Sequence, residues 1–266
     1  MMLGNVLALV MTLTTALQDG PYAPMKKIEI RVTQWQTRQA LIYLPEDMKP
    51  GERYPLLMAF HGKSIAGTDP AKIFREGVAK QIKLGKKIEA VSKADGKLYK
   101  FIVVAPLEEG WSTPPQNVNA MLSDIIRRYP VDTTRIYLTG YSAGGWSVES
   151  AKTHDRELSA RIAACVTMSP ASLDPPYEKR FKLVADNNIH TWYFVGTQDD
   201  YFRENIRRNM DSTARYGKGL TKLTLYPGAH CCWSSFYTPK YRENGMNIYE
   251  WLIQYKKTYA IKPRTK

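Results

Sequence analysis

The chain has 266 residues, of which 44% are hydrophobic and 24% are charged. These values suit an ordinary globular domain with ample core, and no repeat, low-complexity block or acidic tail points to a fibrous or disordered chain. The formal net charge is +13, from 38 Lys and Arg against 25 Asp and Glu. The predicted organisation is a leader over residues 1–24 and one domain over residues 25–266.

Basic residues concentrate in two segments, 72–100 and the tail 256–266. They are explained either by a solvated helical face with a frayed C-terminus, or by attraction to an acidic polymer or anionic surface. No zinc-finger spacing, RNP signature or basic-zipper heptad accompanies them, so no nucleic-acid partner is expected.

The N-terminal leader is apolar from Met2 to Leu17 and has no charge before Asp19. It is too short for a comfortable membrane span. It resembles the core of a signal peptide, with a small-residue stretch at 14–16, but it lacks a positive n-region. An alternative is that the folded protein begins at Met25. The sequence therefore leaves secreted, periplasmic and cytoplasmic locations open.

Strand-like and helical segments alternate along the chain from residue 54 onward. Short Val- and Ile-rich runs separated by helical crossovers predict an α/β fold: a mostly parallel sheet with helices on both faces, preceded by an antiparallel N-terminal strand pair. The predicted strands are 28–33, 40–44, 54–60, 101–105, 135–139, 162–168, 191–195 and 220–226, and the predicted helices are 70–84, 118–129, 143–153, 201–216 and 248–255.

The segment 135–146 predicts a strand, a sharp turn at one serine, and the start of a helix. Gly140 and Gly144 flank Ser142 in the G-x-S-x-G pattern of a nucleophile elbow, which needs this strand-turn-helix context. The pattern therefore predicts Ser142 as a nucleophile.

A serine hydroxyl needs a base, and the four histidines are 61, 154, 190 and 230. His230 follows the predicted strand 220–226 in a loop, and is expected to be the base rather than a loop residue packed by a neighbouring tryptophan. His154 is expected to be exposed at a helix end, and His190 lies at the wrong end of its strand.

The third member of a triad must orient the imidazole. Asp199 and Asp200 both follow the predicted strand 191–195. We favour Asp199, with Asp200 as the N-cap of the helix that begins near residue 201. The order Ser142, Asp199, His230 is the order expected of an α/β-hydrolase.

An oxyanion hole needs preorganised N–H donors. The predicted donors are the backbone N–H groups of Ala143 and of Lys63, the latter in a loop where Gly62 permits close backbone approach. The alternative for that loop is an ordinary strand-ending turn.

Four side chains at the same predicted sheet edge are candidate walls of a substrate pocket. Trp111, Trp146 and Trp233 are aromatic and suit sugar rings or an aromatic acyl group, although ordinary packing is the alternative for Trp111 and Trp146. His61 ends the strand 54–60. No insertion is long enough for a large lid, which indicates an open site.

The three cysteines are Cys165, Cys231 and Cys232. An odd count with two adjacent members does not make a disulfide framework. Cys165 is expected to be a buried small hydrophobe. Further soft ligands for a metal are missing, so neither metal nor cofactor is expected.

Taken together, the motifs resemble the α/β-hydrolase superfamily, and most closely its branch of feruloyl and acetyl-xylan esterases, polyhydroxybutyrate-depolymerase-like esterases and dienelactone-hydrolase-related proteins. The resemblance covers about residues 28–258. It departs from many relatives in the loop after Gly62, which is not glycine-rich, and in the double cysteine after His230. The segments that carry it are 44–45 (LP), 54–62 (YPLLMAFHG), 140–145 (GYSAGG), 196–199 (GTQD), 228–233 (GAHCCW) and 249–252 (YEWL).

The resulting prediction is a serine carboxylic-ester hydrolase that works through an acyl-enzyme on small or carbohydrate-linked acyl esters, without a cofactor. The expected partner is a small-molecule or polymer-borne ester, and the oligomeric state is open. The alternatives are a serine peptidase of the same fold, a non-catalytic binding protein that retains the fold, and a thiol hydrolase using Cys231 or Cys232.

Overall fold

The computed structural model describes residues 20–258. The predicted leader 1–24 and the basic tail 256–266 therefore lie largely outside the described residues. Within the described range, no helix combines the length and the apolar character that crossing a membrane requires.

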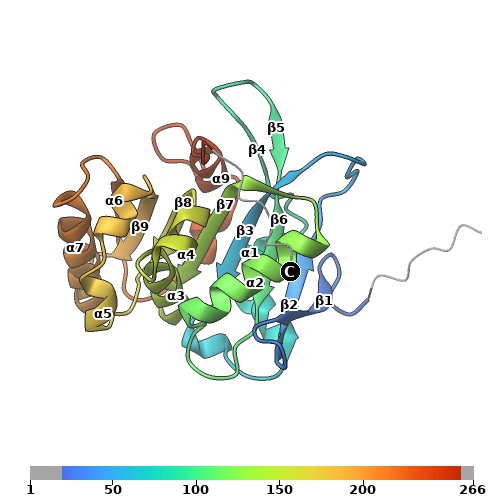
Figure 1. Ribbon diagram of the computed structural model, residues 1–266, viewed down its shortest axis with the longest axis horizontal. Coiled ribbons are helices and arrows are strands. Elements are labelled where there is room, and N and C mark those ends of the chain that lie inside the picture. Colours follow the sequence, from blue (N-terminus) through green and yellow to red (C-terminus); the bar gives the residue numbers. More distant parts are fainter. Residues whose placement is uncertain (1–19, 259–266) are drawn as a thin grey trace, which may run out of the picture.

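An eight-stranded sheet forms the centre of the protein, in the order β1-β2-β6-β3-β7-β8-β9-β10 (Figure 1). The first two strands are antiparallel to each other, and β2 is also antiparallel to β6; every other neighbouring pair is parallel. The predicted α/β fold with an antiparallel N-terminal pair is confirmed. The strands are β1 Lys26–Arg31, β2 Thr37–Tyr43, β3 Tyr54–Phe60, β6 Ile102–Pro106, β7 Val131–Tyr141, β8 Ala164–Met168, β9 His190–Gly196 and β10 Thr221–Tyr226.

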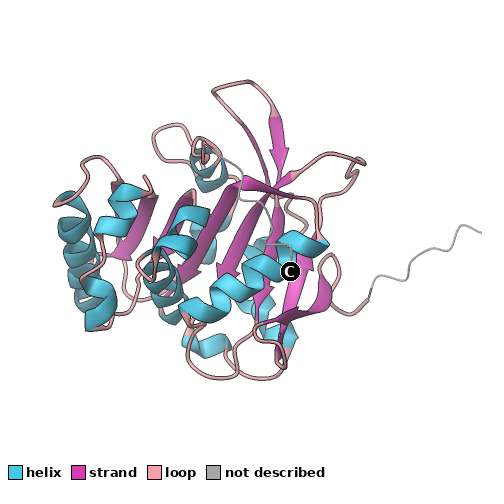
Figure 2. Cartoon of the chain, in the orientation of Figure 1, coloured by secondary structure: helices cyan, strands magenta, loops and turns pink. Residues whose placement is uncertain are grey.

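Helices cover both faces of the sheet (Figure 2). Successive residues of a strand point to opposite faces, so within β3 Leu57 contributes to one core and Leu56 and Met58 to the other. One face packs against α1 Gly77–Lys83, α8 Ser234–Tyr237 and α9 Ile248–Leu252, and the other against α2 Pro115–Arg128, α3 Ala143–Lys152, α4 Arg156–Arg161 and α6 Lys182–Asp186.

Three segments differ from the prediction. The single helix expected over 70–84 is a 3₁₀-helix, η2 Pro70–Arg75, followed by α1. The break occurs because Glu76 is extended and Gly77 takes a φ of +76°, a conformation that glycine adopts readily.

The basic segment 72–100, for which a solvated helical face was one of two explanations, ends in a hairpin of β4 Glu89–Val91 and β5 Leu98–Lys100. This hairpin projects beyond the sheet (Figure 1). Strands of three residues carry too little periodic pattern to be seen in a sequence. For the same reason the prediction missed α4, α6 and α5 Pro175–Glu178.

Candidate functional site

Ser142 lies between the last residue of β7 and the first residue of α3. Its φ is +54° and its ψ is −120°, a strained conformation for a residue with a side chain. The turn is held by the N–H of Ser142, which donates to the carbonyl of Met168 at 2.9 Å, and by its carbonyl, which accepts from Trp146 at 3.2 Å. The strand-turn-helix elbow expected at this serine is therefore present.

The glycines of the elbow act mainly by their lack of a side chain. A Cβ on Gly144 would lie 2.1 Å from the carbonyl oxygen of Phe60, and one on Gly140 would lie 2.3 Å from the carbonyl oxygen of Gly144. The strained φ belongs to Ser142, whereas neither flanking glycine has a positive φ. Close packing of α3 against the ends of β3 and β7 thus fixes the turn.

A hydrogen-bonded chain of three side chains begins at this serine. The Ser142 hydroxyl lies 2.9 Å from Nε2 of His230, and Nδ1 of His230 lies 2.8 Å from Oδ2 of Asp199. Asp199 is buried, while about a third of the His230 side chain is exposed. The three residues come from the carboxyl ends of β7, β9 and β10, where parallel sheets collect reactive groups.

The two aspartates after β9 have different positions. Asp199 occupies the N-cap position of α7 Asp200–Ala214, but its side chain bonds His230 and does not cap the helix. Asp200 is the first residue of α7, is largely exposed, and pairs with Arg203 at 2.6 Å. The N-cap assignment predicted for Asp200 is therefore wrong by one residue.

Ser169 is a neighbour of Asp199 that the sequence analysis did not identify. Its buried hydroxyl donates to Oδ2 of Asp199 at 2.8 Å, so this oxygen accepts two hydrogen bonds, from Ser169 and His230. Charge-assisted hydrogen bonds of this kind hold a carboxylate in one orientation. Ser169 directly follows β8, and its place at that strand end was the available signal.

Aromatic rings enclose the imidazole of His230. Phe202 of α7 stacks on it at 3.8 Å between ring centroids, and Trp233 meets it edge-on at 4.9 Å. Trp233 is itself buried and stacks on Tyr141 at 4.7 Å. Trp233 therefore packs against His230 and is not the exposed pocket wall that the sequence predicted, and this packing coexists with the bonds of His230 to Ser142 and Asp199.

Cys231 and Cys232 are joined by a disulfide directly after His230. The sequence analysis expected no disulfide framework, and indeed no distant segments are linked, but the adjacent pair bonds to itself. The thiol-hydrolase alternative loses its nucleophile, because both sulfur atoms are in the disulfide. Cys165 is a buried free thiol, as expected, and burial raises its pKa to about 12.

The two predicted oxyanion donors each occupy the first position of a helix. Ala143 begins α3, and Lys63 begins the 3₁₀-helix η1 Lys63–Ile65. N–H groups at a helix start have no partner within the helix and can donate to an anion. The loop after β3 lies against the elbow, since a Cβ on Gly62 would be 3.4 Å from Cβ of Ser142.

His61 is not the pocket wall that the sequence predicted, because its side chain is buried. Its Nδ1 donates to the carbonyl of Gly62 at 2.9 Å, and its Nε2 accepts from the N–H of Glu108 at 3.0 Å. Burial lowers the pKa of the imidazole, which favours this neutral form. His61 thus links the loop after β3 to the loop after β6.

Trp111 and Trp146 form an aromatic pair beside α3. Their ring centroids are 5.3 Å apart, and Tyr177 meets Trp146 edge-on at 6.1 Å. Trp111 is 43% exposed, which leaves a ring face available to a ligand. His154 was expected to be exposed but is half-buried, with its ring 6.1 Å from that of Tyr177.

A buried polar cluster links the elements that carry Ser142 and Asp199. Lys152 and Glu149 of α3 are both fully buried and pair at 2.9 Å. Glu149 also accepts from Tyr193 of β9 and Asn209 of α7, each at 2.9 Å. Because every partner is hydrogen-bonded, the cluster fixes α3 against β9 and α7.

No protein-family model and no curated protein matches this chain. Solved structures do match it. A thermostable esterase superimposes with a TM-score of 0.63 at 20% identity, over 87% of this chain and 63% of its own length. A putative dienelactone hydrolase from Klebsiella pneumoniae subsp. pneumoniae gives 0.57 at 14% identity, over 87% and 99%. The chain has the α/β-hydrolase fold.

The structural neighbours also include peptidases. A puromycin-hydrolyzing peptidase of Mycobacterium tuberculosis gives a TM-score of 0.57 at 14% identity, over 80% of this chain and 37% of the peptidase. The structural neighbours are thus esterases, other hydrolases and peptidases. Within residues 20–258, no group of three or more His, Cys, Asp or Glu side chains is placed to hold a metal ion.

Proposed function

We propose that this α/β-hydrolase-fold protein is a serine esterase that hydrolyses carboxylic esters through an acyl-enzyme. The observation that carries the proposal is the continuous hydrogen-bonded chain from Ser142 through His230 to Asp199, with the serine on a strained elbow. This arrangement turns a poor nucleophile into an activated one.

In the proposed reaction, Ser142 Oγ attacks the ester carbonyl while Nε2 of His230 takes the hydroxyl proton. Asp199 holds Nδ1–H and stabilises the imidazolium that forms. The N–H groups of Ala143 and Lys63 would bind the oxyanion, a contribution of about 3 kcal/mol for one such donor. His230 then returns the proton to the leaving alcohol, and water repeats the sequence to release the acid.

The open edge of the site favours small or carbohydrate-linked esters. His230 is partly exposed, and the Trp111–Trp146 pair offers a ring face of the kind on which sugars and aromatic acyl groups pack. We therefore expect Trp111→Ala to raise KM for sugar-linked esters and for esters of aromatic acids, and to leave the hydrolysis of a small aliphatic acetate unchanged.

The decisive experiment is labelling with a fluorophosphonate, followed by intact-mass measurement of wild type, Ser142→Ala and Ser172→Ala. Ser172 is a matched control, since its hydroxyl contacts Tyr201 and Asn205 and has no histidine partner. We expect one adduct on wild type and on Ser172→Ala, none on Ser142→Ala, and a loss of ester hydrolysis of about 10⁴-fold or more in Ser142→Ala. No adduct on folded wild type would overturn the proposal and favour a binding protein.

A serine peptidase is the second candidate, because peptidases are among the structural neighbours. Aryl esters and aminoacyl aryl amides of matched acyl group separate the two. The esterase proposal expects turnover of the ester and no measurable turnover of the amide, since an amide has a much poorer leaving group and needs an enzyme built to protonate it. Measurable, Ser142-dependent turnover of the amide would favour the peptidase.

A further inference from the structure

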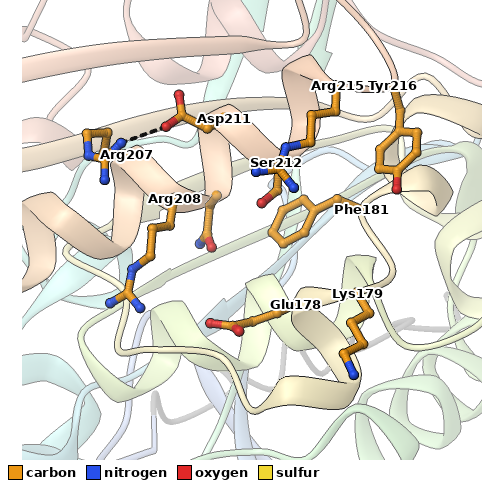
Figure 3. A pocket seen from close by; sticks show the side chains of 10 residues that line it. Glu178, Lys179, Phe181, Arg207, Arg208, Asp211, Ser212, Arg215 and Tyr216 are labelled. Atoms are coloured by element: carbon orange, nitrogen blue, oxygen red, sulfur yellow. Dashed lines mark hydrogen bonds and ion pairs between the residues drawn. The ribbon is translucent and has the colours of Figure 1, made fainter.

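A second concave region lies on the flank of the protein, between α7 and the segment that holds α5 and α6 (Figure 3). Its volume is about 580 Å³. We call it the α7 groove; its lining residues are Glu178, Lys179, Phe181, Arg207, Arg208, Asn209, Asp211, Ser212, Arg215 and Tyr216.

More cationic than anionic side chains line the groove: Lys179, Arg207, Arg208 and Arg215 against Glu178 and Asp211. Among the described residues, the side chains of Lys179 and Arg215 have no ion-pair or hydrogen-bond partner. Arg208 donates to Asn205 at 2.7 Å, and the nearest carboxylate to it, that of Glu204, is 3.9 Å away. Glu178 is the one lining carboxylate without a partner. Two unpaired cations, Lys179 and Arg215, and the loosely paired Arg208 thus lie beside one unpaired carboxylate.

Arg207, on the same helix, is arranged differently. It bonds Glu204 at 2.7 Å and Asp211 at 2.8 Å, and the hydrogen bond with Glu204 raises its pKa. Figure 3 shows Arg207 turned toward Asp211, Arg208 extended away from Asp211, and Arg215 lying beside Ser212. The carboxylates of α7 therefore hold Arg207 closely, while Arg208 is loosely paired and Arg215 is unpaired. Like charges in the groove raise each other's energy, and a bound anion would lower it.

The floor of the groove is less polar than its walls. Phe181 is 1% exposed, and Asn209 is buried with its amide committed to Glu149. Tyr216, at the far end, is about half exposed. The half-exposed ring of Tyr216 beside cationic side chains suits a ligand that has ring faces and carries carboxylates.

The groove and the candidate active site share α7. The helix begins beside Asp199, and Phe202 of its first turn stacks on His230. At 1.5 Å per residue, Arg208 and Arg215 lie about 12 and 22 Å along the helix from Asp200. A single ligand can therefore contact both Ser142 and these arginines only if it is extended. Along α7, the residues on one helix face follow one another at spacings of three or four: Tyr201, Asn205, Arg208, Ser212 and Arg215.

We propose that the α7 groove binds the carboxylates of an acidic polysaccharide while an ester on the same chain is cleaved at Ser142. The proposal rests on the proposed esterase function and adds its substrate class. The net charge of +13 acts in the same direction, because it draws polyanions to the protein at low salt.

The test compares two triple variants of the full chain with the same change in charge. The groove variant is Lys179→Gln, Arg208→Gln, Arg215→Gln. The control variant is Lys86→Gln, Lys93→Gln, Lys97→Gln, at positions in and beside the projecting β4–β5 hairpin.

Three substrates are compared: acetylated polygalacturonate, acetylated xylan as its neutral counterpart, and an aryl acetate. We expect the groove variant alone to lose about tenfold or more in kcat/KM on the acidic polymer, with all variants within about twofold on the neutral substrates.

Binding is measured separately with Ser142→Ala and polygalacturonate oligomers by calorimetry. The groove substitutions are expected to weaken Kd about tenfold or more at low salt, and about 0.5 M salt to abolish most of the difference. Equal losses of affinity in both triple variants would show that net charge, and not the groove, binds the oligomers, and this would overturn the proposal. No loss of affinity in the groove variant, or binding of inorganic polyphosphate without binding of the oligomers, would also overturn it.

If the wild-type protein hydrolysed none of the esters, the esterase function itself would be rejected, whether or not the oligomers bind.

Discussion

The loop that carries Ser142 and the loop that carries His230 are held in different ways. Around Ser142 the contacts are between backbones: Gly144 packs against the carbonyl of Phe60 with no room for a Cβ. After His230 the contacts are made by side chains. The Tyr226 hydroxyl donates to the carbonyl of Cys231 at 2.8 Å, and Glu76 Oε1 accepts from the N–H of Ser234 at 2.6 Å.

This contrast suggests how each loop responds to change. Where two backbones are in contact, no side chain can move aside to make room. A single added methyl group at the elbow therefore displaces α3. Four groups hold the histidine loop: the Tyr226 hydroxyl, the Glu76 carboxylate, the disulfide and the stacked Trp233. Removing any one of these groups leaves the other three contacts in place. Substitutions at the elbow should therefore have larger effects than those in the histidine loop.

Gly144→Ala tests the elbow and should have the largest effect. Its Cβ would lie 2.1 Å from the Phe60 carbonyl oxygen, so strand and helix must separate. We expect a loss of about 3 kcal/mol or more in the free energy of unfolding, by urea titration, and a fall of about a hundredfold or more in aryl-ester hydrolysis. Gly110→Ala is the control, since a Cβ there meets nothing within 4 Å. Equal effects at both glycines would contradict the close-packing account.

Ser169→Ala removes one of the two donors to Oδ2 of Asp199. A hydrogen bond to a charged group contributes about 1.5–3 kcal/mol, so kcat on an aryl acetate should fall about tenfold or more while KM stays unchanged. The pH profile of kcat should be recorded alongside, because a purely structural role would leave its shape unaltered. Ser172→Ala is the control, and unchanged kcat in Ser169→Ala would rule out the positioning role.

Glu76→Gln weakens the attachment of the histidine loop to the start of α1. The carboxylate accepts from both the N–H and the hydroxyl of Ser234, and a neutral amide oxygen accepts less strongly. We expect the melting temperature to fall by about 2–4 °C, equivalent to roughly 1 kcal/mol, and kcat by about threefold. Full activity together with a lowered melting temperature would restrict Glu76 to stability.

Loss of the Cys231–Cys232 disulfide should have the smallest effect. The double variant Cys231→Ser, Cys232→Ser keeps the hydroxyl bond from Tyr226 and the Trp233 stack, so kcat should fall only about two- to threefold. A phosphine reductant should lower wild-type activity to the same level and leave the double variant unchanged. Complete inactivation by the reductant would show that the disulfide, and not the shared contacts, holds His230.

Much of the fold follows from local patterns. The continuous apolar runs at 54–60 and 162–168 contain strands β3 and β8, because a strand buried on both faces needs apolar side chains along its whole length. Ser142, Asp199 and His230 could be selected because each follows a strand, and strand ends meet at one edge. The β4–β5 hairpin could not be predicted because its strands of three residues are shorter than two strand repeats. The short helices α4, α5 and α6 could not be predicted because four to six residues make less than two helical turns.

The sequence by itself determined the sheet, the order of its helical crossovers and the loops that carry the three hydrogen-bonded side chains, because these depend on periodicity and on neighbours along the chain. Tertiary structure alone decided that Ser169 bonds Asp199, that His61 is buried between two loops, and that Arg207 is closely paired while Arg208 is only loosely paired. Such contacts join residues far apart in the chain or choose between adjacent side chains. Their energies depend on distance and burial in the folded protein, which no local pattern encodes.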